Sequence, residues 1–103
     1  MDNNSIKNNS KRAEELLTIG IEHGKKQAWK EAIPVLEEAL KIDPELAKAH
    51  QVLFMAYGAL MNRDDAMKHY NILKTLDSNM AKQLEESIAF TMISRMGPSI
   101  YQL

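Results

Sequence analysis

The chain has no cysteine and few glycine, proline or aromatic residues. Its 103 residues include 4 Gly and 3 Pro, and 6% are aromatic. Without cysteine there can be no disulfide framework, thiolate metal ligand or thiol nucleophile. With 45% hydrophobic and 26% charged residues, the balance is that of a helix-rich globular chain rather than a disordered one. The length fits about one domain, which argues against an enzyme with a cleft between two domains.

Neither sign of charge dominates, and no long apolar run occurs. There are 13 Lys and Arg against 14 Asp and Glu, so the net charge is −1 and we expect no nucleic-acid partner. The longest apolar run covers residues 52–61, whereas a membrane span needs about 20 residues, so we predict a buried helix and no membrane span. The first ten residues contain no apolar core like that of a signal peptide, which favours a cytoplasmic protein.

Apolar residues recur at three- and four-residue steps in five stretches, which predicts five helices. We expect helices over about 10–25, 28–42, 65–76 and 78–96, and a further helix that restarts at Asp43-Pro44-Glu45 and runs to about Met61. Ser10, Asn62 or Asp64, and Asp77 with Ser78 are the expected caps of three of them. Gly24 should loosen the end of the first helix, Pro34 should bend the second slightly, and Gly97-Pro98 should stop the last.

The spacing also predicts which side chains face the core. In the first helix these are Leu16, Leu17, Ile19, Gly20 and His23; in the second, Trp29, Ala32, Ile33, Leu36, Ala39 and Leu40; in the fourth, Ala66, Met67, Tyr70, Leu73 and Leu76.

Residues 13–46 align with residues 47–80 when the chain is shifted by 34 positions. Four identities result: Ala13 with Ala47, Gly24 with Gly58, Ala32 with Ala66, and Asp43 with Asp77. A period of 34 residues is typical of helix-turn-helix repeats.

The chain therefore resembles the tetratricopeptide repeat family. The first repeat supplies the family's small and turn residues as Gly20, Ala32, Ala39 and Pro44, and the second supplies Tyr57, Ala66 and Tyr70. The second repeat departs from the pattern, with Phe54 at a small position, Leu73 in place of Ala and Ser78 in place of Pro, which predicts a wider separation of its two helices.

The resemblance implies an all-α fold: antiparallel helix-turn-helix repeats that form a short right-handed α-solenoid of five helices. A flexible arm over residues 1–9 would precede a domain over 10–97, which consists of repeats 13–46 and 47–80 and a capping helix over 78–96. A tail over 98–103 would follow. Because each repeat contacts only its neighbours, such an array should bury less surface than a compact domain.

The resemblance also implies a concave, mostly apolar groove formed by the first helix of each repeat and by the capping helix. The residues assigned to it are Leu17, Ile21, Gln51, Val52, Met55, Ala59, Lys82, Glu85, Ala89 and Met92. Such a groove suits an amphipathic helix or an extended apolar peptide. The alternative is that these residues meet one another in an ordinary core, although two repeats cannot bury all of them.

No pattern of catalytic or metal-ligating residues is found. His23, His50 and His69 lie far apart in the sequence, and no second histidine lies four residues from any of them, so we expect no metal site, no cofactor and no enzymatic activity. Packing explains His23 and His50 better, because they take large positions of the repeats.

Two functions remain open. The first is a non-catalytic interaction module, an adaptor or small chaperone that binds a protein or peptide in the groove. The second is a structural scaffold or assembly subunit that docks through its capping helix and the tail residues Ile100, Tyr101 and Leu103 into a homo-oligomer or a larger complex.

Overall fold

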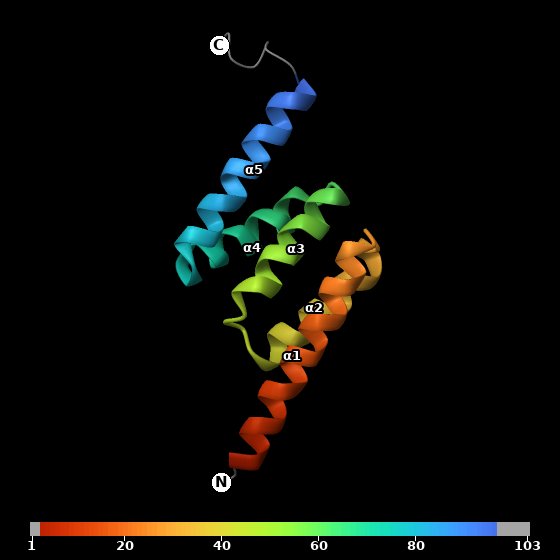
Figure 1. Ribbon diagram of the computed structural model, residues 1–103, viewed down its shortest axis with the longest axis vertical. Coiled ribbons are helices and arrows are strands. Elements are labelled where there is room, and N and C mark those ends of the chain that lie inside the picture. The colour runs from red at the N-terminus through yellow and green to blue at the C-terminus, as the bar shows by residue number, and fades with distance from the viewer. Residues whose placement is uncertain (1–2, 97–103) are drawn as a thin grey trace.

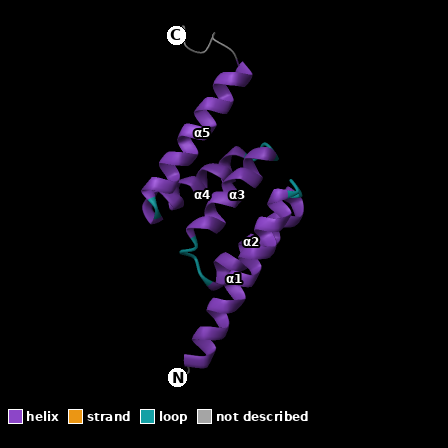
Figure 2. Cartoon of the chain, in the orientation of Figure 1, coloured by secondary structure: helices purple, strands orange, loops and turns teal. Residues whose placement is uncertain are grey.

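The chain folds into five α-helices joined by short turns (Figure 2). The computed structural model describes the backbone of residues 3–96 and the side chains of residues 8–87. The helices are α1 (Asn3–Lys25), α2 (Trp29–Ile42), α3 (Ala47–Ala59), α4 (Arg63–Leu76) and α5 (Ser78–Met96). Over this described part there is no strand, and the predicted all-α fold of five helices is confirmed.

Each helix packs against the next one, and in addition α1 contacts α3 and α3 contacts α5. The start of α1 and the end of α5 lie at opposite ends of the long axis (Figure 1). The molecule measures 60 × 26 × 19 Å, and its radius of gyration is 15.6 Å, against about 13 Å for a compact domain of this length. Its accessible surface is 7286 Å², against about 5900 Å² for a compact monomer of this mass. The expected shortfall in burial is confirmed.

The 34-residue period of the sequence is also present in the backbone. Helices α2 and α4 begin 34 residues apart and end 34 residues apart, and so do the ends of α1 and α3. Both α1 and α3 close with a Schellman motif, in which the left-handed residue is Gln27 (φ 59°) or Met61 (φ 65°). In each motif the next amide donates to a carbonyl five residues back, Ala28 to His23 and Asn62 to Tyr57, both at 2.8 Å. The first helical hairpin, α1 with α2, and the second, α3 with α4, therefore have the same backbone arrangement.

Two predicted helix starts were wrong. Helix α1 begins at Asn3 rather than Ser10, so residues 3–9 continue the helix instead of forming an irregular arm. Extending an existing helix costs far less than nucleating one, which lets residues of modest helix propensity join it.

The Asp43-Pro44-Glu45 segment does not begin α3, which starts at Ala47 after Leu46. Asp43 instead ends α2: its backbone N–H donates to the Ala39 carbonyl, and its Oδ1 accepts from the Glu45 N–H at 3.0 Å. Its side chain is therefore used within the turn. Helix α1 ends at Lys25, as predicted, and the left-handed residue that follows it is Gln27.

Two predicted caps were confirmed. Asn62 Oδ1 accepts from the Asp65 N–H at 3.2 Å, so α4 starts at Arg63, directly after its cap. Asp77 Oδ1 accepts from the Met80 N–H at 3.0 Å at the start of α5. Helix α2 continues through Pro34. The predicted stop at Gly97-Pro98 lies outside the described residues.

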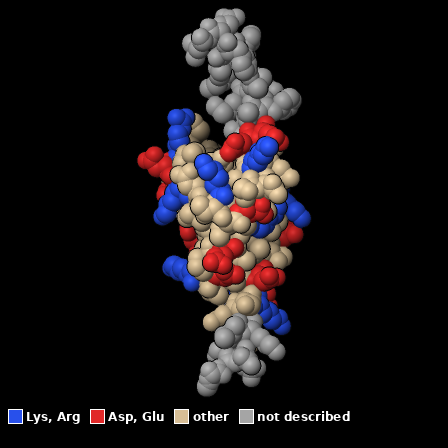
Figure 3. Space-filling model, turned by 90° about the vertical axis from the view of Figure 1, so that its left-hand side faces the viewer, with Lys and Arg blue, Asp and Glu red and all other residues tan. Residues whose placement is uncertain are grey.

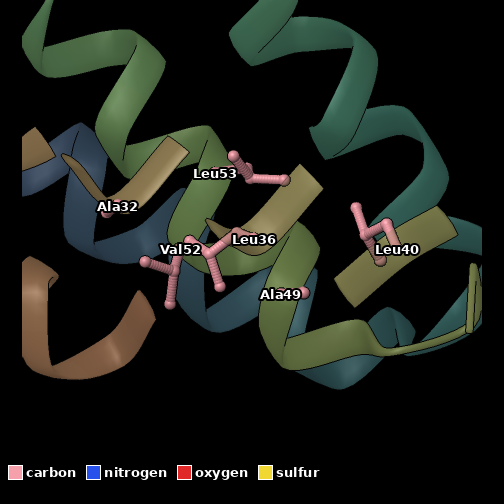
Figure 4. Packing of buried hydrophobic residues seen from close by; sticks show 6 residues of the cluster. All are labelled: Ala32, Leu36, Leu40, Ala49, Val52 and Leu53. Carbon is pink, nitrogen blue, oxygen red and sulfur yellow. The ribbon is translucent and has the colours of Figure 1, made fainter. Parts of the chain in front are cut away.

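The main core lies between α2 and α3, where six buried side chains meet (Figure 4). They are Ala32, Leu36, Leu40, Ala49, Val52 and Leu53. Gly20 brings α1 close to this core, because a Cβ at its position would lie 2.4 Å from Leu36 Cδ2. A second cluster of Leu73, Ala81 and Leu84 joins α4 to α5, and Phe54 packs against it.

Three predicted core residues are exposed: Ile19, Met67 and Leu76. The buried residues of α4 are Ala66, His69 and Leu73, at steps of three and four. His69 is therefore a core residue that the apolar pattern did not predict. Elsewhere the visible surface mixes Lys and Arg with Asp and Glu, and uncharged residues lie between them (Figure 3).

Candidate functional site

A groove lies between α1 and α3, and Trp29 at the start of α2 also lines it. It encloses about 310 Å³. Its lining residues are Ile21, Gly24 and Lys25 from α1, Trp29 from α2, and Lys48, Gln51, Val52 and Met55 from α3.

The local sequence explains how Trp29 reaches the groove. The Schellman turn at Gln27 reverses the chain, so that Trp29, the first residue of α2, lies back against the end of α1. Gly24 leaves space for the indole, since a Cβ there would lie 3.3 Å from the Trp29 ring and 3.4 Å from Val52 Cγ1. A Cβ at position 24 would therefore be tight against the Trp29 ring, which would have to shift slightly to admit it.

The groove has an apolar floor and a basic rim. Val52 is buried, Ile21 and Trp29 are half-buried against the main core, and Met55 is 44% exposed. Lys25 and Lys48 are exposed, and no carboxylate is among the lining residues of this groove. The Lys25 ammonium lies 3.8 Å from the Glu22 carboxylate, but both side chains are largely in solvent, where such a pair contributes little. The Glu22 carboxylate nevertheless offsets the charge of Lys25, so the positive bias of the rim comes mainly from Lys48.

The structure brings together four of the ten residues predicted for the groove: Ile21, Gln51, Val52 and Met55. Leu17 packs against the main core instead. Ala59, Lys82 and Glu85 are exposed, and none of them lines this groove.

The other predicted site residues cannot be placed. Ala89 and Met92 lie outside the described side chains, and the tail residues Ile100, Tyr101 and Leu103 lie outside the described residues. Sequence reasoning missed Gly24, Lys25, Trp29 and Lys48 as lining residues. For Lys48 the signal was its spacing, since it lies one helical turn before Gln51 and Val52.

A second polar feature lies between α3 and α4, where His50 of α3 meets His69 of α4. The two residues, called here the histidine pair, are 3% and 5% exposed. Their Nδ1 atoms are 2.9 Å apart. His50 Nε2 lies 2.9 Å from the carbonyl oxygen of Pro44, in the turn between α2 and α3. The pair thus connects α4, through α3, to the turn that follows α2.

The acceptor at one end fixes the tautomers of both rings. A carbonyl oxygen only accepts, so His50 Nε2 carries a hydrogen and donates it to Pro44. In a neutral ring His50 Nδ1 is then an acceptor, and His69 Nδ1 must donate to it. His69 Nε2 is left as a bare nitrogen, 3.6 Å from Glu37 Oε2 of α2, which is longer than a hydrogen bond.

Glu37 and Tyr57 complete this network. The Tyr57 hydroxyl donates to Glu37 Oε2 at 2.6 Å, and its ring stacks on His69 with centroids 5.7 Å apart. Burial, and then the hydrogen bond to Glu37, raise the pKa of Tyr57 above its ordinary value. Burial lowers the pKa of His69, an effect that the negative charge of Glu37 partly opposes. At neutral pH His69 is therefore uncharged.

Within the described part of the chain, no group of three or more His, Asp or Glu residues is arranged to hold a metal ion. No helix within residues 3–96 combines the length and apolar character that a membrane crossing requires. Comparison with known proteins found no match among family models, curated proteins or solved structures.

Proposed function

We propose that the chain is a non-catalytic interaction module of tetratricopeptide-repeat type, an adaptor or small chaperone, which binds an apolar segment of another polypeptide in the groove between α1 and α3. The observation that carries the proposal is the groove itself, where the exposed Met55 lies among the partly buried Ile21 and Trp29. Methionine fills irregular space at little cost, which suits a surface that receives apolar side chains of another chain.

The basic rim narrows the class of partner. Lys25 and Lys48 flank an apolar floor without a carboxylate among its lining residues. A bound segment would therefore place a large apolar side chain on the floor and acidic residues beside it. Complementary charge of this kind accelerates association and selects among partners more than it adds affinity. The volume of about 310 Å³ is at the lower limit for a small-molecule pocket, and it suits one or two peptide side chains.

The only tryptophan of the chain provides the assay, because Trp29 lines the groove. Synthetic amphipathic peptides with leucine anchors, flanked by glutamate in one version and by lysine in another, are titrated against the protein while tryptophan emission is recorded. We expect the glutamate version to bind more tightly and to lose that advantage as salt is added.

A matched pair of variants locates the binding surface. Met55 in the groove is 44% exposed and Met67 on α4 is 43% exposed, so a glutamate costs similar burial at either position. We expect Met55→Glu to abolish the change in emission and Met67→Glu to leave it intact, with unchanged helical circular dichroism in both. Equal binding by the two variants would place the partner surface elsewhere and overturn the proposal.

Sedimentation of the free protein addresses the second function, in which copies of the chain assemble with one another. A monomer at the concentrations of the peptide titration would support the interaction module. A concentration-dependent dimer that Met55→Glu dissociates would instead show that the groove receives another copy of this chain.

A further inference from the structure

The groove makes no use of the histidine pair, which is buried between α3 and α4. We propose that the pair is a proton-sensitive joint between α3 and α4, anchored to the Pro44 turn: it is closed when both rings are neutral and is opened by acid, because the closed pair has room for no more than one added proton. The inference is independent of the proposed function and rests on the geometry of the four ring nitrogens.

The closed pair accepts a first proton at only one place. His50 Nε2 already donates to the Pro44 carbonyl, and the Nδ1–Nδ1 contact already contains one hydrogen. The bare His69 Nε2 is the remaining site, and a proton there would face Glu37 Oε2. A charged ring at that position would gain an ionic partner while it remained shielded from water.

The closed pair excludes a second proton. With both rings charged, each Nδ1 would carry a hydrogen, and the two N–H groups would point at each other across 2.9 Å. Two donors at that separation cannot form a hydrogen bond, and two positive rings would repel each other within a buried site. The rings must move apart before the second proton can bind.

The charges around His69 decide the direction of the pH effect. Glu37 of α2 favours the charged ring, while the other histidine of the pair, on α3, and Lys68 of α4 disfavour it. Tyr57 of α3 stacks on His69 and remains neutral, since its pKa is raised. Burial is the largest effect and lowers the pKa of His69, so the folded chain holds this proton less tightly than the unfolded chain does.

The direction in which stability changes with pH follows from the number of protons that the folded and unfolded chains bind. An unfolded chain takes up a proton on each of these two imidazoles as the pH falls below about 6.5, whereas the folded chain takes up at most one. The contribution of the pair to stability is therefore complete above about pH 6.5 and is lost as the pH falls through that value. For each proton that the folded chain excludes, the unfolding equilibrium constant rises about tenfold for every unit by which the pH falls.

The experiment is urea unfolding of the full chain at several values between about pH 7.5 and about pH 5, a range in which histidine titrates. His69→Asn keeps an amide donor near His50 but cannot titrate, and His23→Asn is the control because His23 is outside the pair. We expect the unfolding equilibrium constants of the wild type and of His23→Asn to rise equally as the pH falls. For His69→Asn we expect this rise to be smaller, by a factor of about ten for each pH unit. Equal slopes for all three proteins would overturn the proposal.

Nitrogen NMR of the imidazole rings tests the joint in the wild type, whether or not His69→Asn folds. At about pH 7.5, where neutral rings dominate, we expect the Nε2–H tautomer for His50 and the Nδ1–H tautomer for His69. As acid is added, loss of these two signals together with the folded spectrum would support a joint opened by protons. Two Nε2–H tautomers at neutral pH, or a folded spectrum in which both rings are fully charged, would contradict it.

Discussion

Replacing Gly20 with alanine tests whether α1 and α2 pack at the closest distance that their backbones allow. A Cβ at position 20 would lie 2.4 Å from Leu36 Cδ2 and 2.5 Å from its Cγ, which is closer than real Cβ contacts. Leu36 is fully buried in the main core, so its side chain cannot move aside into solvent. The added methyl must therefore push α1 away from α2 or force Leu36 out of its rotamer.

The size of the effect is a balance of two opposing contributions. Overpacking of a core costs about 1–3 kcal/mol, while the higher helix propensity of alanine returns about 1 kcal/mol. We expect Gly20→Ala to lower the free energy of unfolding by about 1–2 kcal/mol, because the overlap includes two atoms of a fully buried side chain. For a domain of this size each kcal/mol corresponds to about 4–8 °C in Tm.

Gly58 provides the matched control, since it lies within α3 and a Cβ there would meet nothing within 4 Å. Gly58→Ala should raise the free energy of unfolding by about 0.5–1 kcal/mol, through the higher helix propensity of alanine alone. Thermal and urea unfolding followed by far-UV circular dichroism measures both variants. The reasoning fails if Gly20→Ala raises Tm as much as Gly58→Ala does, because the two helices would then have room for a larger residue.

Three further substitutions test other parts of the fold by the same unfolding measurements. Leu53→Ala removes a fully buried side chain of the main core and should cost about 2–5 kcal/mol; a loss below about 1 kcal/mol would show that this core is loosely packed. Met61→Gly should raise stability by about 0.5–1 kcal/mol, because Met61 is 86% exposed and has a left-handed backbone; a lower Tm would mean that its side chain is packed. Pro34→Ala restores an amide donor at an exposed position inside α2 and should add about 1–3 kcal/mol, whereas no gain would mean that the Lys30 carbonyl is already satisfied.

The helices could be predicted from the sequence where local chemistry determines them. Asn62 and Asp77 cap the helices that follow them, because a short polar side chain reaches the free amides of the next turn with little dependence on the rest of the fold. The start of α3 could not be predicted in this way. Asp43 is of a residue type that often caps helices, but its side chain accepts a hydrogen bond within the turn between α2 and α3. Which amide group the Asp43 carboxylate reaches depends on the path of the backbone through this turn, and the residue type alone does not determine that path.

The groove was predicted in part, for a related reason. The family resemblance assigned Gln51 and Met55 of α3 to one groove, and both line the groove between α1 and α3. Neither the resemblance nor the periodicity of single helices shows that Trp29, from the following helix, lines it too. That position depends on the left-handed turn at Gln27, and glutamine carries no strong signal for such a turn.

The histidine pair was missed because each residue was considered alone. His50 and His69 are 19 residues apart, and at that distance no local pattern joins them. A signal was nevertheless present in α4, where His69 lies three residues after Ala66 and four before Leu73, on the face that the core requires. A histidine at a core position needs a hydrogen-bond partner, and a second histidine at a large position of the same hairpin could supply one.

Two kinds of contact with different consequences hold α3 in place. The apolar contacts of Leu36 and Leu53 are favourable over a range of small displacements, because burial has no direction. The hydrogen bonds of His50 and His69 hold only at one relative placement of α3, α4 and the Pro44 turn. The same α3 forms one wall of the groove against α1. The pair therefore orients this wall of the groove relative to α4 and the Pro44 turn.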